Sequence, residues 1–321
     1  MITIQIVGAG QLGSRHLQAL QAVETPLSIH VVDPSPASLE VARQRFEALI
    51  GVTKHSICFD TVVEPSESVD LAIVATNANT RHEAALALLR ASQVRFMVLE
   101  KLLFDQSAPY DSFVKELAST GTQAWVNCPM RVMAPYESIR QQLGGRPINY
   151  RVEGSQFGLV TNAIHYLDHV VHLTGCSEFT IDCADLDAQT IPSKRAGFLE
   201  LTGRLFARFA DGSRCEIVCH AEGNAPVLVE ISTPAARWLV RESESKLWAS
   251  AADTNWAWSE QPARIPYQSE MTAQVVRDLL AYGSCGLTPI TQSISTHKAL
   301  LEPLRDWLRT GNPTLDHFPF T

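Results

Sequence analysis

The sequence lacks several features that would set it apart from ordinary globular proteins. No apolar run approaches the roughly eighteen residues that a membrane-spanning helix needs, so we expect no membrane segment. There is no excess of positive charge either. The formal net charge is −8, which argues against a nucleic acid or an anionic membrane surface as a partner. Internal repeats and low-complexity linkers are also absent.

The seven cysteines form no CxxC pair and no regular framework. Cys215 and Cys219 stand four residues apart on a predicted strand, but no third or fourth metal ligand is evident nearby. We therefore expect reduced thiols in a cytoplasmic protein. The first predicted strand begins at Ile2, which leaves no room for a signal peptide and agrees with that location.

With 321 residues, the chain is long enough for two domains with ample cores. Residues 1–125 alternate predicted strands and helices, which indicates an α/β domain with a doubly wound parallel sheet. Residues 126–321 are predicted to form a C-terminal α+β domain with an open, mostly antiparallel sheet, whose last helices pack back on the first domain. Its predicted elements are helices near 135–143, 162–174, 270–282 and 292–310, and strands over most of 179–240.

The most informative motif is a glycine-rich stretch between a predicted strand over residues 2–7 and a predicted helix over 11–23. Gly8 permits a tight turn, Gly10 lets backbone amides approach a pyrophosphate, and Gly13 lets the helix pack closely on the strand. The N–H groups and dipole of the helix N-terminus then hold the phosphates. We expect a dinucleotide here, and its predicted contacts are Gly8, Gly10, Gln11, Leu12 and Gly13.

Asp33 bears on which dinucleotide binds. It ends the second predicted strand, twenty residues beyond Gly13, where an acidic side chain accepts hydrogen bonds from an adenosine ribose. A carboxylate there repels a 2′-phosphate, and the following Pro34, Ser35 and Pro36 supply no cation to hold one. Asp33 therefore favours NAD over NADP as the cofactor.

A polar segment follows the fourth predicted strand. The backbone amides of Thr76 and Asn77 and the Thr76 hydroxyl are candidates to line the nicotinamide side of the cofactor. The alternative is a polar turn that caps the next helix. Thr80, followed three residues later by Glu83, is a capping-box signal and predicts that this helix covers residues 81–90.

Glu100 and Lys101 end the fifth predicted strand, after an apolar stretch. A lysine in this place is costly unless it is paired or exposed. Lys101 is therefore either poised beside the nicotinamide or reaches solvent, as lysines at strand ends commonly do.

The second domain contains a histidine-rich segment. If this segment is helical, His165, Asp168, His169 and His172 lie along one stripe. A histidine beside a carboxylate suits proton transfer. Since there is no HExxH glutamate and hydride transfer needs no metal, we expect no metal here. The alternative is a helix whose histidines, above all His172 and His169, are satisfied polar groups against a sheet.

Motifs in both halves resemble the glucose–fructose oxidoreductase and inositol dehydrogenase family, called Gfo/Idh/MocA. They read GAGQLGSRH, ATNANTRHEAALALL, VLEK, VNCPMRVMAPY and NAIHYLDHV. The resemblance implies an N-terminal Rossmann domain and NAD(P)-dependent oxidation or reduction at a carbon of a sugar, cyclitol or similar polyol. It also implies a homodimer or homotetramer. The pair NCPMR and NAIHYLD further resembles a branch associated with surface-sugar and nonulosonate gene clusters.

The resemblance also implies residue roles. The family's EK dipeptide falls on Glu100 and Lys101, and its helix histidine falls on His165. Lys101 is then expected to hydrogen-bond the reacting oxygen, with Glu100 among the cofactor contacts and His165 as the acid/base partner. The predicted substrate contacts are Asn162, Asp168 and, for an anionic group, Arg131.

Three departures from the family pattern stand out. Leu102 takes the place of the usual proline, and the segment after strand four is one residue longer before His82. Thr161 replaces an aspartate that many members carry four residues before the histidine. This last change keeps open a non-catalytic sensor that binds NAD(P) and controls a protein partner. A redox-neutral hydrolase or epimerase of sugars that retains its NAD is a further alternative.

Overall fold

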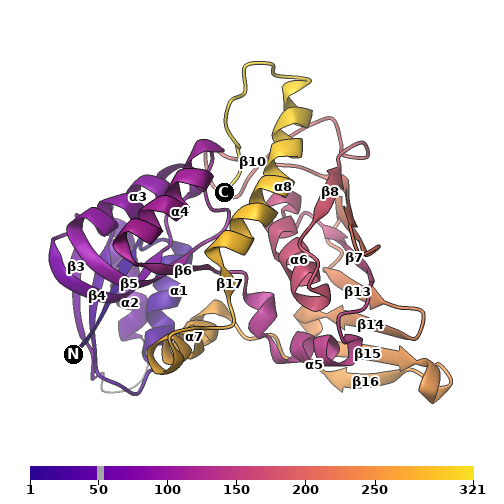
Figure 1. The fold of residues 1–321 in the computed structure, drawn as a ribbon, viewed down its shortest axis with the longest axis horizontal. Coiled ribbons are helices and arrows are strands. Elements are labelled where there is room, and N and C mark those ends of the chain that lie inside the picture. The colour runs from indigo at the N-terminus through magenta and orange to yellow at the C-terminus, as the bar shows by residue number, and fades with distance from the viewer. Residues whose placement is uncertain (49–53) are drawn as a thin grey trace. The chain divides into compact units, whose positions relative to one another are not determined.

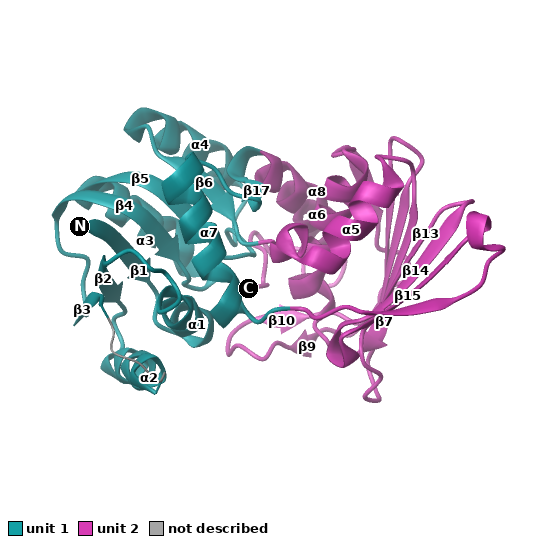
Figure 2. Ribbon diagram, turned by 90° about the horizontal axis from the view of Figure 1, so that it is seen from below, with its two compact units in different colours: residues 1–127, 266–291 teal, residues 128–265, 292–321 magenta. Residues whose placement is uncertain are grey.

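The computed structural model describes residues 1–48 and 54–321, which form two compact units (Figure 2). Unit 1 contains residues 1–127 and 266–291, and unit 2 contains residues 128–265 and 292–321. The predicted division after residue 125 lies beside the first boundary between the units. That division assigned residues 266–291 to the second domain, whereas here they belong to unit 1.

A seven-stranded sheet forms the centre of unit 1 (Figure 1). Its strand order is β17-β6-β5-β4-β1-β2-β3. Strands β1 to β6 run parallel, and the short edge strand β17 is antiparallel to β6. The strand order reverses between β1 and β4, so the crossover helices on either side of this point cover opposite faces. The predicted doubly wound sheet is confirmed. The strands are β1 (Ile2–Val7), β2 (Leu27–Val32), β3 (Ser56–Asp60), β4 (Ser66–Val74), β5 (Ser92–Leu99), β6 (Gln123–Val126) and β17 (Thr288–Pro289).

The helices of unit 1 start close to where the sequence places them, with one exception. Helix α2 begins at Pro36, because Ser35 Oγ accepts the Ser38 N–H and a proline occupies the first turn. Helix α3 begins before the predicted capping box, because Asn77 O accepts the N–H groups of both Thr80 and Arg81. The capping-box prediction was therefore wrong. The helices are α1 (Gln11–Leu20), α2 (Pro36–Glu47), α3 (Ala78–Ala91), α4 (Ala108–Thr120) and α7 (Gln268–Tyr282).

Unit 2 is built on an eight-stranded open sheet in the order β16-β15-β14-β13-β7-β12-β11-β8. Its strand pairs are antiparallel except for β7 with β12, so the predicted α+β domain is confirmed. Helix α6 packs on β12 and on α5. Within the described ranges, no helix is both long and apolar enough to span a membrane.

The bounds of the unit 2 elements are as follows. The helices are α5 (Ala134–Leu143), α6 (Leu159–Thr174) and α8 (Ile290–Arg309), whose first two residues fall in unit 1. The strands of the large sheet are β7 (Asn149–Ser155), β8 (Phe179–Asp182), β11 (Gly203–Phe209), β12 (Arg214–His220), β13 (Leu228–Ser232), β14 (Ala236–Arg241), β15 (Lys246–Ala251) and β16 (Ser259–Pro262). Two short strands, β9 (Ile191–Pro192) and β10 (Leu199–Glu200), pair with each other.

The glycine loop between β1 and α1 explains the close fit of these two elements. Gly8 has a φ of +97°, a conformation that favours glycine. A Cβ on Gly13 would stand 1.8 Å from the carbonyl oxygen of Gly8, so a side chain at this position has no room. At Gly10, by contrast, a Cβ would meet no atom within 4 Å. Gly13 is therefore required for packing, whereas Gly10 leaves open space above the loop.

These two glycines give a matched test. Gly13→Ala should destabilise the protein by about 1–3 kcal/mol through overpacking and lower its Tm by several degrees. Gly10→Ala should leave the Tm unchanged, yet weaken dinucleotide binding, because its methyl group occupies the open space. Thermal unfolding and titration calorimetry measure the two effects. An equal loss of Tm in both variants would contradict this account of the loop.

Candidate active site

The N-terminus of α1 is suited to hold an anion. Gly10 is the N-cap residue, and no side chain caps this end of α1 among the residues that the structure describes. The first N–H groups of an uncapped helix point outward along its dipole, and such an end binds phosphate groups. The open space at Gly10 admits a ligand to these amides. The loop therefore fits the pyrophosphate of a dinucleotide, with Gln11 and Leu12 in the first turn.

Asp33 lies beside this loop, as the sequence predicts. Its Oδ2 accepts the N–H of Ala9 at 2.7 Å, and its Oδ1 accepts the N–H of Ser35 at 2.8 Å. The carboxylate therefore joins the glycine loop to the segment after β2. Asp33 is only half-buried, so its side chain remains accessible beside the loop.

Arg45 is a neighbour of the loop that the sequence did not reveal. It comes from the last turn of α2 and donates to Ser14 Oγ at 2.6 Å and to Gln11 Oε1 at 2.8 Å. Only the packing of α2 against α1 brings it there, since the two ends are more than thirty residues apart. The Arg45 guanidinium therefore supplies a positive charge at the first turns of α1. The segment after β2, which contains Pro34 and Pro36, supplies none.

Glu100 is a buried carboxylate at the end of β5, only 2% exposed. His16 Nε2 lies 2.9 Å from its Oε1, and Asn127 Nδ2 donates to the same oxygen at 2.6 Å. Burial by itself would raise the pKa of this carboxyl. The hydrogen bonds from His16 and Asn127, together with the charge of Arg81, outweigh burial and lower the pKa from 4.5 to about 2. Glu100 is therefore ionised at neutral pH.

Helix α7 completes this cluster. The second ring nitrogen of His16, Nδ1, lies 2.7 Å from Thr272 Oγ1. Gln268 accepts a hydrogen bond from Asn127 at 2.9 Å and donates one to Thr272 at 3.0 Å. The late segment of the chain that returns to unit 1 thus fixes the imidazole that holds Glu100. We call His16, Glu100, Asn127, Gln268 and Thr272 the Glu100 cluster.

Lys101 follows Glu100 directly and is half-buried. The backbone that follows Lys101 is also held in place, because the buried guanidinium of Arg81 donates to the carbonyls of Leu102 and Leu103. Arg81 donates to the carbonyl of Thr76 as well, and so ties the end of β4 to the segment after β5. The Lys101–Leu102 peptide bond is cis. Residues on both sides of Lys101 are therefore fixed by buried charged side chains.

Thr76 and Asn77 lie at the end of β4, where the sequence places them. The Thr76 hydroxyl is buried and makes no hydrogen bond with the residues that the structure describes. Asn77 is the exposed N-cap of α3. An unsatisfied buried hydroxyl at the carboxyl end of a strand agrees with a ligand-facing role.

The predicted acid/base histidine, His165, lies in the second turn of α6 in unit 2 and is half-buried. The start of this helix is held by a residue that the sequence did not reveal. Glu200, from β10, accepts the N–H of Val160 at 2.9 Å and that of Thr161 at 3.2 Å. A carboxylate at a helix N-terminus is stabilising. The amide nitrogen of Asn162 donates to Phe157 O at 2.6 Å and to Gly158 O at 3.0 Å, within the same first turn.

Arg131 and Asp168, both predicted to contact substrate, contact each other. The guanidinium donates through Nε at 2.6 Å and through Nη2 at 2.7 Å to the two carboxylate oxygens. Both side chains are buried, at 7% and 2% exposure. This two-point ion pair anchors α6 to the turn at residues 129–132.

The two remaining histidines of α6 serve as polar groups within unit 2. His169 is fully buried, with Nδ1 2.9 Å from the Tyr150 hydroxyl, and burial keeps its pKa well below the ordinary range. Burial also lowers the pKa of His172 to about 4. Both are neutral at pH 7. The Nε2 atom of each is buried without a hydrogen bond among the described residues, so the alternative of satisfied histidines holds only for Nδ1 of His169. Lys101 belongs to unit 1 and His165 to unit 2.

Comparison with known families agrees with this geometry. Residues 2–128 match the family model GFO_IDH_MocA, described as an oxidoreductase family with an NAD-binding Rossmann fold. Residues 2–128, about two-fifths of the chain, are therefore similar to that family. The matched range contains the glycine loop, Asp33, Arg81 and the Glu100–Lys101 pair. No curated protein sequence matches the chain.

Solved structures share the fold over nearly the whole chain. An oxidoreductase from Agrobacterium radiobacter in complex with NAD+, L-tartaric acid and magnesium has a TM-score of 0.73 at 13% identity, covering 97% of each chain. UDP-N-acetylglucosamine 3-dehydrogenase from Acidithiobacillus ferrooxidans has a TM-score of 0.68 at 13% identity, covering 94% of this chain and 96% of its own. A super-repressor mutant of Gal80p from Saccharomyces cerevisiae has a TM-score of 0.71 at 13% identity, covering 97% and 96%.

Arg81→Met tests the support of the Lys101 segment. It removes the donor from three backbone carbonyls, and each lost buried bond costs about 1–3 kcal/mol, so we expect a loss of about 3 kcal/mol or more in the free energy of unfolding. Arg90→Met, at an exposed position of the same helix, should change stability by less than about 0.5 kcal/mol. Denaturant unfolding of both variants measures the difference, and equal effects would argue against the role assigned to Arg81.

Glu100→Gln tests the Glu100 cluster through pH. A carboxyl whose pKa falls from 4.5 to about 2 on folding contributes stability above pH 4.5 and loses it as the pH falls towards 2. Because glutamine does not titrate, the stability advantage of the wild type over Glu100→Gln should shrink by about 2 kcal/mol between about pH 6 and about pH 3. Denaturant unfolding across this range measures it. A difference that does not vary with pH would show that Glu100 is not held as an anion.

Proposed function

We propose that the protein is an NAD-dependent dehydrogenase or reductase that acts on a hydroxyl-bearing carbon of a sugar, sugar derivative or cyclitol. The observation that carries the proposal is the placement of Lys101. Its half-buried side chain follows a buried, ionised Glu100 and precedes two carbonyls held by buried Arg81, at the carboxyl end of β5. Ligands of doubly wound sheets bind at this edge.

The chemistry assigned to Lys101 follows from its type and place. When NAD is bound, its nicotinamide accepts or donates the hydride. The Lys101 ammonium donates a hydrogen bond to the reacting oxygen and stabilises the charge that develops there. His165 takes or returns the hydroxyl proton as the acid/base partner.

The three residues predicted to contact substrate, Arg131, Asp168 and Asn162, have different surroundings. Arg131 and Asp168 neutralise each other inside unit 2, which supports a positioning role for them under α6 and His165. Asn162 is half-buried in the first turn of the same helix and belongs to no ion pair among the described residues, so it is a better candidate for a substrate contact than Arg131 or Asp168. Asp33 favours NAD as the cofactor, because its carboxylate lies beside the glycine loop and would repel the 2′-phosphate of NADP.

A second candidate is a regulator that binds NAD(P) without turning it over. The similarity in fold to Gal80p, whose studied variant is a super-repressor, favours this alternative, together with Thr161 in place of an acidic residue. Tight cofactor binding without any reduction of nicotinamide by a broad panel of polyols, sugars and UDP-sugars would favour the regulator. Turnover with any member of the panel would favour the dehydrogenase.

Lys101→Ala is the direct test of the lysine. With a substrate found in the panel, kcat should fall by roughly 10²–10⁴-fold, because the donor to the reacting oxygen is lost. NAD binding should persist, since the glycine loop is untouched. Lys115→Ala, at an exposed position of α4, serves as the control and should keep wild-type turnover. Near wild-type turnover of Lys101→Ala, with NAD still bound, would remove this lysine from the chemistry.

A further inference from the structure

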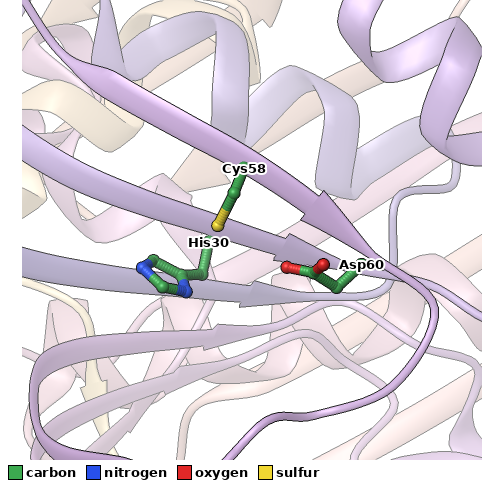
Figure 3. Close-up of side chains that lie close together, drawn as sticks. All are labelled: His30, Cys58 and Asp60. Carbon is green, nitrogen blue, oxygen red and sulfur yellow. The ribbon is translucent and has the colours of Figure 1, made fainter.

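Three side chains that bind metals in many proteins meet at the outer edge of the sheet in unit 1. His30 on β2 and Cys58 on β3 are partners in register on adjacent parallel strands. Asp60 stands two residues beyond Cys58, and residues two apart on a strand project to the same face. Figure 3 shows the three side chains pointing into one space from these two strands.

Their spacing fits a small cation. The ring nitrogen, the sulfur and the carboxylate oxygen all lie within 4.8 Å of one another. Zinc binds such atoms at about 2.0–2.3 Å in a tetrahedron, which places them roughly 3.5 Å apart. Small side-chain rotations therefore close the triangle without movement of the backbone. All three residues are half-buried, which leaves an entry path and room for a water as the fourth ligand.

The chemical types of the three donor atoms limit which metal ion can bind. Thiolate and imidazole prefer zinc and the neighbouring transition metals over magnesium or calcium, which select oxygen ligands. We propose that His30, Cys58 and Asp60 bind one divalent transition-metal ion of the zinc type. Sequence reasoning expected no metal, because it considered only the histidines of α6 and the pair Cys215 and Cys219. Thirty residues separate His30 from Asp60, and only strand pairing brings them together.

A reactive cysteine is the competing interpretation of this cluster. Burial and the adjacent Asp60 carboxylate raise the pKa of the Cys58 thiol, so it is a poor nucleophile at neutral pH. A bound cation would instead neutralise the Asp60 carboxylate and displace the thiol proton. The proposal uses no part of the dinucleotide site and stands independently of the proposed function.

Cobalt(II) is the probe that tests the site, because a thiolate ligand gives it a charge-transfer absorption band. The intact chain, stripped with a chelator, should bind one equivalent of Co²⁺ with this band and lose the band when Zn²⁺ is added. Cys58→Ser should abolish the band, and His30→Asn and Asp60→Asn should weaken Co²⁺ binding by about tenfold or more. Cys176→Ser, at another half-buried cysteine in unit 2, should leave the band unchanged.

A second measurement on the wild type does not depend on whether variants fold. Zn²⁺ should protect Cys58, and not Cys176, from thiol alkylation, as measured by mass spectrometry of the peptides. Protection of Cys58 together with the cobalt band supports the site. Absence of the band in the wild type, its persistence in Cys58→Ser, or alkylation of Cys58 at the same rate with and without Zn²⁺ would overturn the proposal.

Discussion

The hydrogen bonds that the buried Glu100 carboxylate makes with His16 and Asn127 are the constraint on which the end of β5 depends. A carboxylate buried in the sheet is costly unless hydrogen bonds replace its water. Here the donors come from α1 and from the end of β6, and α7 fixes the imidazole. Lys101 is the residue directly after Glu100. The hydrogen bonds that stabilise the buried carboxylate therefore also fix the backbone from which the proposed catalytic side chain extends.

The same principle supports the second proposed catalytic side chain. His165 stands on a helix whose first turn is capped by Glu200 and whose middle is anchored by the Arg131–Asp168 pair and by His169 on Tyr150. None of these contacts requires a ligand. Each unit thus carries one proposed catalytic side chain on an element held by buried polar contacts, and precise positioning of a side chain requires such support.

Much of the fold could be read from the sequence, because local signals determine it. The glycine loop and the buried strand before Glu100 each depend on neighbouring residues. The partners of Glu100 could not be read, since His16 and Thr272 are 256 residues apart and meet only through packing. Arg81, Arg45 and Glu200 were missed for the same reason. Arg131 and Asp168 were identified as important residues, yet a sequence does not show that two charges face each other.

The central claim is that the Glu100 cluster holds Lys101 at the nicotinamide end of a dinucleotide site. A crystal structure of the protein with bound NAD tests it most directly. The account predicts the pyrophosphate on the amides of the 8–13 loop, Glu100 still bonded to His16 and Asn127, and the Lys101 ammonium within about 3.5 Å of a substrate oxygen positioned for hydride transfer. A nicotinamide ring bound away from Lys101, or a Glu100 side chain released from His16, would contradict it.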